Sequence, residues 1–171
     1  MKRGLLAVAV LSAFGLAVPA QAADTLVRVD AGFGVHPVAG ITAATGLPIL
    51  NTVRTVPPGG RPWAIEKLRV RIKDDGSITA KGEGLVLAGS DAAGTRGGIL
   101  QVAATLFCGT AQFTSPAADI SLGGNFEIRG TLTPQPPNPC VNPALLIRNA
   151  TGGVLGSWFA GGTISDPHDD D

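Results

Sequence analysis

The sequence predicts an all-β protein, a single antiparallel β-sandwich of about nine short strands with one disulfide; a closed barrel is the less favoured arrangement. Three observations predict this fold. Apolar and polar residues alternate with a period of two in several short segments, and no helical stripe of apolar residues is sustained. Turn-forming residues are abundant, with 24 glycines and 13 prolines in 171 residues. Two cysteines follow an N-terminal segment with the features of an export signal.

The first 22 residues have the pattern of a cleaved secretory signal peptide. Lys2 and Arg3 are followed by an uncharged, mostly apolar run over residues 4–18, and Ala20-Gln21-Ala22 is a small-x-small cleavage site. The apolar run is shorter than the roughly 20 residues of a membrane-spanning helix. We therefore expect cleavage near Ala22-Ala23 and a secreted or periplasmic protein.

The rest of the chain divides into one domain and a short tail. We expect the β-sandwich over residues 23–164 and an acidic flexible tail over residues 165–171, which has no apolar anchor. Without Lys2 and Arg3, the mature chain has 11 basic and 13 acidic residues, and a net charge near −2 gives no field that would attract nucleic acid. No second apolar run reaches membrane length, so we expect neither a nucleic-acid partner nor a transmembrane segment in the mature chain.

Cys108 and Cys140 are expected to form a disulfide, because an even pair in an oxidising compartment is typically bonded. Closing a loop of about 33 residues stabilises a fold by roughly 3–4 kcal/mol in the chain-entropy description. The alternative, a catalytic thiol, requires a histidine partner, and only His36 and His168 are present.

Four strands are expected in the first half of the chain. Residues 25–31 alternate weakly, and residues 48–56 are a second candidate. The clearest pattern lies in residues 65–73, where basic and apolar residues alternate from Lys67 onward. Residues 77–87 then return antiparallel across Asp74-Asp75-Gly76.

The register of this hairpin follows from the apolar pattern. A three-residue loop places Ile72 opposite Ile78 and Lys67 opposite Glu83, so that apolar residues face apolar residues. A two-residue turn would mix the two faces. We therefore predict the three-residue loop, with Gly76 in the left-handed backbone conformation.

The second half of the chain carries shorter alternating segments separated by glycine and proline. These strands are expected over residues 98–108, 111–114, 120–122, 125–132, 144–148 and 154–160. The last two should form a hairpin around Thr151-Gly152-Gly153. The proline-rich residues 57–62 and 134–143 are expected to be loops, because proline cannot continue a β-ladder.

No catalytic constellation is recognisable, and we predict no catalytic residue, no metal site and no cofactor. The sequence lacks the G-x-S-x-G, H-E-x-x-H, C-x-x-C and phosphate-loop motifs. The alternative is a small secreted carboxylate-dependent hydrolase, which needs two carboxyl groups in one cleft and a raised pKa on one of them. Structural roles are more plausible for Asp74 and Asp75 in the turn, for Glu83 opposite a lysine and for Glu127 beside Arg129.

Four cations are expected along one strand face. Lys67, Arg69, Arg71 and Lys73 should point the same way at intervals of about 6.6 Å, where they could bind an anionic glycan or another anionic surface. The structural alternative, which the sequence favours, is a solvated outer face whose charges prevent edge-to-edge aggregation.

Trp63 and Trp158 are the second candidate binding residues. Aromatic rings can stack on sugars, so a carbohydrate site is conceivable. Core packing is the favoured interpretation, because Trp63 follows a proline turn and Trp158 lies in the closing strand.

Several strings resemble a group of uncharacterised secreted bacterial β-rich proteins. They are residues 56–63 (VPPGGRPW), 104–108 (ATLFC), Pro139-Cys140 with 145–147 (LLI), and 157–160 (SWFA). The resemblance covers residues 53–161. It implies an exported β-rich domain with Cys108 paired to Cys140, and no known activity, cofactor or catalytic residue.

The resulting expectation is an exported, non-enzymatic protein that serves as a binding or structural module of the cell envelope or extracellular space, with an unknown partner there. One alternative is a binder of glycans or anionic surfaces through the Lys67–Lys73 face. The other is the carboxylate-dependent hydrolase.

Overall fold

The structure, a computed structural model, describes residues 23–165, and the expected leader and residues 166–171 of the expected tail lie outside this range. Strands make up 52% of the described residues and helix 2%, so the all-β class is confirmed. Ser165, expected to begin the tail, is the last residue of β13 (Trp158–Ser165). No helix in the described part of the chain is long and apolar enough to cross a membrane.

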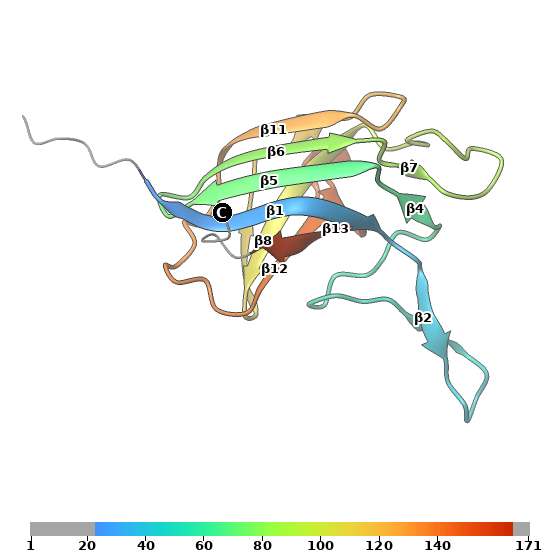
Figure 1. The fold of residues 1–171 in the computed structure, drawn as a ribbon. Coiled ribbons are helices and arrows are strands. Elements are labelled where there is room, and N and C mark those ends of the chain that lie inside the picture. The colour runs from blue at the N-terminus through green and yellow to red at the C-terminus, as the bar shows by residue number, and fades with distance from the viewer. Residues whose placement is uncertain (1–22, 166–171) are drawn as a thin grey trace, which may run out of the picture.

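One antiparallel sheet of nine strands forms the body and curls as a half-barrel (Figure 1). Its order is β10-β8-β12-β13-β1-β5-β6-β11, with β9 paired to β8. Besides β13, its strands are β1 (Thr25–Gly34), β5 (Lys67–Lys73), β6 (Ser77–Glu83), β8 (Gln101–Cys108), β9 (Ala111–Thr114), β10 (Ala118–Asp119), β11 (Phe126–Thr131) and β12 (Pro143–Asn149).

Two small sheets and one short helix complete the fold. Strand β2 (Val38–Ile41) pairs with β3 (Pro48–Leu50), and β4 (Trp63–Ala64) pairs with β7 (Val86–Leu87). The 3-10 turn Thr151–Gly153 joins β12 to β13, which form the expected hairpin.

The expected sandwich and the observed half-barrel differ in sheet continuity. A sandwich has two separate sheets, whereas here the path from β10 to β11 is hydrogen-bonded throughout. Register shifts within the β1–β13, β1–β5 and β12–β13 pairs let the sheet bend, and strand twist adds to this curvature. Alternation and strand spacing are alike in both arrangements, so the sequence pattern could not distinguish them.

The predicted β5–β6 register is confirmed. Ile72 pairs with Ile78 and Lys67 pairs with Glu83, as a three-residue loop requires. Gly76 has φ +81°, the left-handed conformation expected for it.

The concave side of the sheet is filled by one apolar core, so the half-barrel holds side chains rather than a ligand-sized interior space. Strands β1, β5, β6, β8, β11, β12 and β13 all contribute aliphatic side chains that are at most 3% exposed. They are Val27, Val29, Leu68, Val70, Ile72, Ile78, Ala80, Val102, Ala104, Leu106, Ile128, Leu145, Ile147 and Ala160.

A segment of irregular chain, residues 51–59, covers part of the convex side. We call it the strap. The expected strand over residues 48–56 therefore ends at Leu50, and its remainder belongs to the strap. The strap turns back at Arg54 and Thr55, which have φ +49° and +70°, and it buries Val56 at 3% exposure. A threonine in this region of φ is strained, so packing must hold the turn in place.

Strands β8 and β12 are buried on both faces. Phe107 and Leu146 point away from the concave core, yet they are 0% and 2% exposed. The strand expected over residues 98–108 begins only at Gln101, and Leu100, which precedes it, is 53% exposed.

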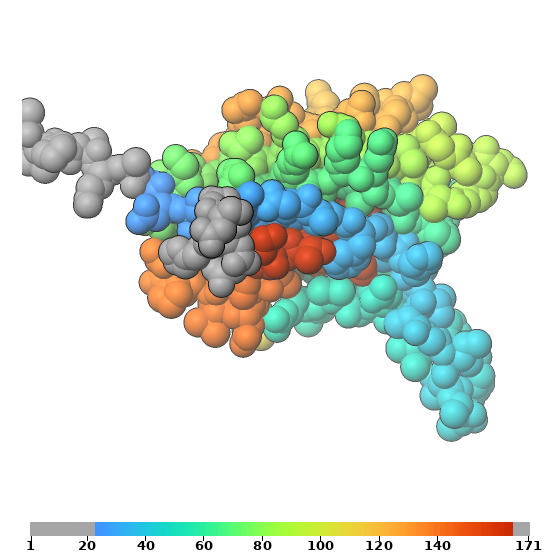
Figure 2. Space-filling view, in the orientation of Figure 1, coloured from blue at the N-terminus to red at the C-terminus, as the bar shows by residue number. Residues whose placement is uncertain are grey.

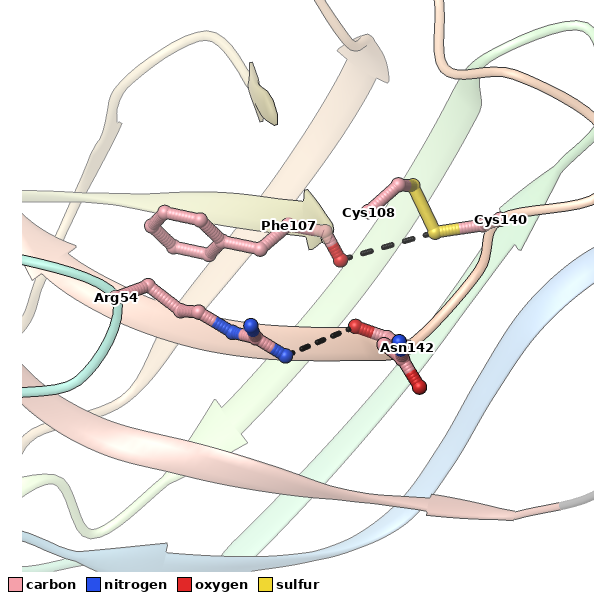
Figure 3. Close-up of a disulfide and its surroundings, with 5 residues drawn as sticks. All are labelled: Arg54, Phe107, Cys108, Cys140 and Asn142. Atoms are coloured by element: carbon pink, nitrogen blue, oxygen red, sulfur yellow. Dashed lines mark hydrogen bonds between the residues drawn. A yellow bond between two sulfur atoms is a disulfide. The ribbon is translucent and has the colours of Figure 1, made fainter. Parts of the chain in front are cut away.

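The Cys108–Cys140 disulfide is present and ties the proline-rich loop to the end of β8 (Figure 3). The two Cα atoms are 5.0 Å apart. The same loop contacts the strap, because Arg54 Nη2 donates a hydrogen bond of 3.2 Å to the carbonyl of Asn142 (Figure 3). One covalent and one polar link thus hold this end of the fold.

Reduction of the disulfide should lower the free energy of unfolding by about 3–4 kcal/mol, because the bond closes a long loop of the unfolded chain. Urea unfolding with and without reductant measures this loss as a shift of the midpoint. The Cys108→Ser/Cys140→Ser variant should behave like the reduced protein. An unchanged midpoint would show that the link contributes nothing.

Gly34→Ala should destabilise the fold by about 1–3 kcal/mol, the usual cost of overpacking. A Cβ at this position would overlap the carbonyl of Trp63, and backbone cannot move aside cheaply. Thermal unfolding of this variant can be compared with Gly89→Ala, a matched control whose Cβ would meet nothing within 4 Å. Equal melting temperatures for the two variants would contradict the predicted close contact.

Candidate functional site

The convex side of β1, β5, β6 and β11 is not covered by the strap and carries a concentration of cations. On β5, four cationic side chains are exposed and alternate with Leu68, Val70 and Ile72, whose burial in the core fixes the strand. The sequence predicted this row. We define the basic face as Arg28, Lys67, Arg69, Arg71, Lys73, Lys81 and Arg129.

Cross-strand register places Arg71 at the centre of the basic face. Arg71 pairs with Arg28 of β1 on one side and with Thr79 of β6 on the other, and Thr79 in turn pairs with Arg129 of β11. Neighbouring strands are about 4.8 Å apart, and alternate residues of one strand are about 6.6 Å apart. Four strands therefore bring their basic residues onto one surface.

Ion pairs neutralise only part of this charge. Glu83 accepts from Lys67 Nζ at 2.8 Å, and Glu127 lies 3.5 Å from Lys81 Nζ and 2.5 Å from Arg129 Nη2. A further pair joins Arg28 Nε to an Asp30 carboxylate oxygen at 2.6 Å on β1.

The rest of the row is not held in such pairs. Arg69 pairs across the strands with Lys81, which is also a cation. In residues 23–165, Arg69, Arg71 and Lys73 take part in no ion pair. These three side chains are the ones available to an external anion.

The Lys67–Glu83 pair shifts both pKa values in favour of the charged forms. The hydrogen bond to Glu83, followed by its negative charge, raises the pKa of Lys67. The hydrogen bond from Lys67, followed by its positive charge, lowers the pKa of Glu83. Lys67 is thus engaged within the fold, and it contributes less to an external site than Arg71.

Trp63 and Trp158 lie in the core, at 6% and 1% exposure, as the favoured interpretation expected. Trp63 packs against Phe159 with ring centroids 4.3 Å apart, and Trp158 meets the edge of Phe33 at 6.3 Å. The indole N–H of Trp158 donates to the carbonyl of Asn51 at 3.0 Å. Neither ring offers a face on which a sugar could stack.

The carboxyl groups that share a surface hollow are engaged in polar contacts. Glu83, Asp119 and Glu127 line this hollow of about 630 Å³ beside β6 and β11. The two glutamates are in ion pairs, and Asp119 accepts from Gln101 Nε2 at 3.0 Å. The lowered pKa of Glu83 is opposite to what a general acid needs.

The other expected acidic residues have structural contacts as well. Asp75 Oδ1 accepts from the backbone N–H of Ser77 at 2.8 Å in the β5–β6 turn. Hydrogen bonds from the Ser77 side chain and backbone lower the pKa of Asp75. Among the described residues, no group of three or more histidine, cysteine, aspartate or glutamate side chains could hold a metal ion.

Sequence reasoning identified the row on β5 but did not assemble the whole face. Arg28 joins it because β1 lies beside β5, although 38 residues lie between Arg28 and Lys67, where the row begins. Arg129 joins it through the β6–β11 pairing. The available signal was the outward alternation of Arg129, which could be combined with β5 only once strand order was known.

Comparisons with protein-family models, with curated proteins and with solved structures find no match to this chain.

Lys67→Gln should raise the pKa of Glu83 toward its ordinary value, because the variant loses the charge and the donor that lower it. NMR titration of the Glu83 carboxyl measures the change. Lys73→Gln is the matched control, since Lys73 is not among the groups that shift Glu83. An equal Glu83 pKa in wild type and in Lys67→Gln would contradict the pairing.

The same pair should make a small pH-dependent contribution to stability. A lowered carboxyl pKa stabilises the fold above the unfolded value of about 4.3, and the effect is lost as pH falls through the folded pKa. A raised lysine pKa stabilises it below about 10.4, and the effect is lost as pH rises through the folded pKa. The stability difference between wild type and Lys67→Gln should therefore be largest between these limits.

Proposed function

We propose that this chain is an exported, non-enzymatic binding module whose basic face docks on an anionic polysaccharide of the cell envelope or extracellular matrix. The observation that carries the proposal is the row Arg69-Arg71-Lys73, three exposed cations that take part in no ion pair among the described residues. The export signal expected in residues 1–22 is consistent with such a partner.

The shape of the face favours a polymer over a small molecule. The four side chains on β5 extend over about 20 Å at strand spacing, and they are exposed on the convex side of the sheet. A small ligand needs a concave site that surrounds it. An extended polyanion can instead lie along β5 and meet one cation after another.

Arginine suits this ligand. Its guanidinium group can donate two parallel hydrogen bonds to a carboxylate, sulfate or phosphate group, and it remains charged at any physiological pH. The buried alternate residues of β5 fix the strand that carries the basic side chains. Binding therefore loses little backbone entropy, because the strand is already ordered.

The carboxylate-dependent hydrolase gains no support from the geometry. Its candidate acids are engaged in ion pairs and hydrogen bonds, and the Glu83 pKa is shifted downward. A polysaccharide-binding role requires none of these groups to react.

The test is retention of the secreted chain, residues 23–171, on immobilised alginate and dextran sulfate, with neutral dextran as the blank. Wild type should be retained at low ionic strength and released by salt, because exposed charges are screened. Arg69→Ser/Arg71→Ser should reduce the salt needed for elution by about half or more, since it removes the unpaired centre of the face.

A matched control removes the same charge elsewhere. Arg54→Ser/Arg61→Ser changes two exposed arginines that hydrogen-bond to Asn142 and Ser90, outside the basic face. It should elute close to wild type. Equal loss in both double variants would indicate a net-charge effect, and unchanged retention in Arg69→Ser/Arg71→Ser would remove the proposed site. Binding to anionic lipid vesicles but not to either polysaccharide would also overturn the proposal.

A further inference from the structure

The hairpin formed by β2 and β3 projects from the body as a separate finger (Figures 1 and 2). We define the finger as residues 38–50. Its turn is ordered by backbone hydrogen bonds, including Thr42 N–H to the Leu47 carbonyl at 2.8 Å. At its base, Asn51 N–H donates to the Pro37 carbonyl at 2.9 Å. The finger is therefore a defined element of structure and does not lie against the sheet.

The composition of the finger is unlike that of an ordinary solvated hairpin. No charged residue occurs between Asp30 and Arg54. Large apolar side chains are exposed on both strands and at the tip, and none belongs to the core. Their exposed fractions are Val38 46%, Ile41 69%, Leu47 62%, Ile49 49% and Leu50 55%.

Such a surface favours burial against another molecule. Exposed strand edges normally carry charges that prevent association, and clustered exposed apolar side chains mark interaction sites. The finger has free edges and no charge, and an isolated two-stranded hairpin is only marginally stable in water. Contact with a partner would remove its apolar side chains from solvent.

A lipid bilayer fits the finger poorly as the partner. The outer edges of a two-stranded hairpin have unpaired N–H and C=O groups, which the hydrocarbon region cannot satisfy. The segment also lacks the tryptophan, tyrosine, lysine and arginine residues that anchor proteins at the membrane interface. A protein surface fits the finger better. It supplies apolar contacts for the exposed side chains and hydrogen-bonding groups for the strand edges.

The chain itself carries an apolar cleft at the end of the sheet near β4 and β7. The cleft has a volume of about 740 Å³, within the usual range for binding pockets. Its apolar lining comes mainly from Trp63, Leu87, Ile99 and Phe159. Arg61 and Thr95 contribute polar groups, and Gly98 lies in its wall. The finger extends away from β4 and β7, so it does not occupy the cleft of its own molecule (Figure 1).

We propose that the finger of one copy seats its Ile41–Leu47 tip in the Trp63–Phe159 cleft of a second copy. The donor and acceptor surfaces are different parts of the chain, so the contact is heterologous and can repeat from copy to copy. Neither surface is part of the basic face. One hairpin buries less area than a standard interface of about 1,600 Å², so we expect a weak contact that appears at high protein concentration.

The test uses two variants that disable opposite halves of the contact. Ile41→Asp/Leu47→Asp places charge on the finger tip, and both side chains are mostly exposed, so the core is not altered. Gly98→Glu places charge in the cleft at a position where an added Cβ meets nothing within 4 Å. Leu122→Asp/Val141→Asp is the matched control, because it replaces two aliphatic side chains of similar exposure outside both surfaces.

Sedimentation and light scattering across a concentration series provide the measurement. Wild type and the control should increase in mean mass about twofold or more with concentration, whereas the finger variant and the cleft variant should each remain monomeric. A mixture of these two variants should form a one-to-one complex, since one retains the cleft and the other retains the finger.

Three results would overturn the proposal. They are a wild type that stays monomeric at every concentration, oligomers that persist in the finger variant, and a mixture of the two variants that forms no complex. Finger-dependent flotation of wild type with phospholipid vesicles would identify lipid as the occupant instead. Circular dichroism of each variant confirms that the fold is retained.

Discussion

The contact between Trp158 and the strap determines which part of the sheet is covered. The backbone N–H of Trp158 donates to the carbonyl of Pro57, and its carbonyl accepts from Gly59 N–H, at 3.1 and 2.8 Å. Its indole N–H reaches the carbonyl of Asn51. A buried indole requires such a partner, and the strap supplies it. The strap is thus fixed to β13 at both ends, and the finger is the segment between β1 and the strap.

This coverage divides the convex surface into two chemically different halves. Strands β8 and β12 are buried on both faces, whereas β5 and β6 are solvated on one face and alternate. A solvated face requires polar residues, but it does not require them to share one sign. The basic face holds seven of the eleven basic residues between 23 and 165, in a chain without net charge. That separation of charge exceeds what the fold needs, and it is the reason to assign the face a ligand.

The parts of the fold that the sequence predicted are those with one buried face and a short connection. In the β5–β6 hairpin, alternation identifies the buried side and Gly76 fixes the loop, so the register followed from the residues. Residues 48–56 were different. Their apolar character indicated burial, but Ile49 is exposed on the finger and Val56 is buried beneath the strap. Periodicity cannot reveal which apolar residues find a partner within the same chain.

The candidate site was predictable to the same extent. The row on β5 required only local alternation, whereas the contribution of Arg28 depends on β1 lying next to β5. The strap likewise brings residues 51–59 over β13, about a hundred residues later in the chain. Contacts at such sequence separation are set by tertiary packing, and a single sequence contains no local signal for them.

The basic face and the finger have complementary consequences if both proposed contacts form. A single row of exposed cations binds weakly, because each surface charge is screened and contributes little. Copies joined through finger and cleft would present several basic faces to one polymer, and binding at the second face would then be intramolecular. Since the finger and the cleft both lie outside the basic face, assembly would leave the cations free. Retention of the control Leu122→Asp/Val141→Asp on a polyanion should therefore exceed that of the finger variant, although the two proteins carry the same added charge and the same basic face.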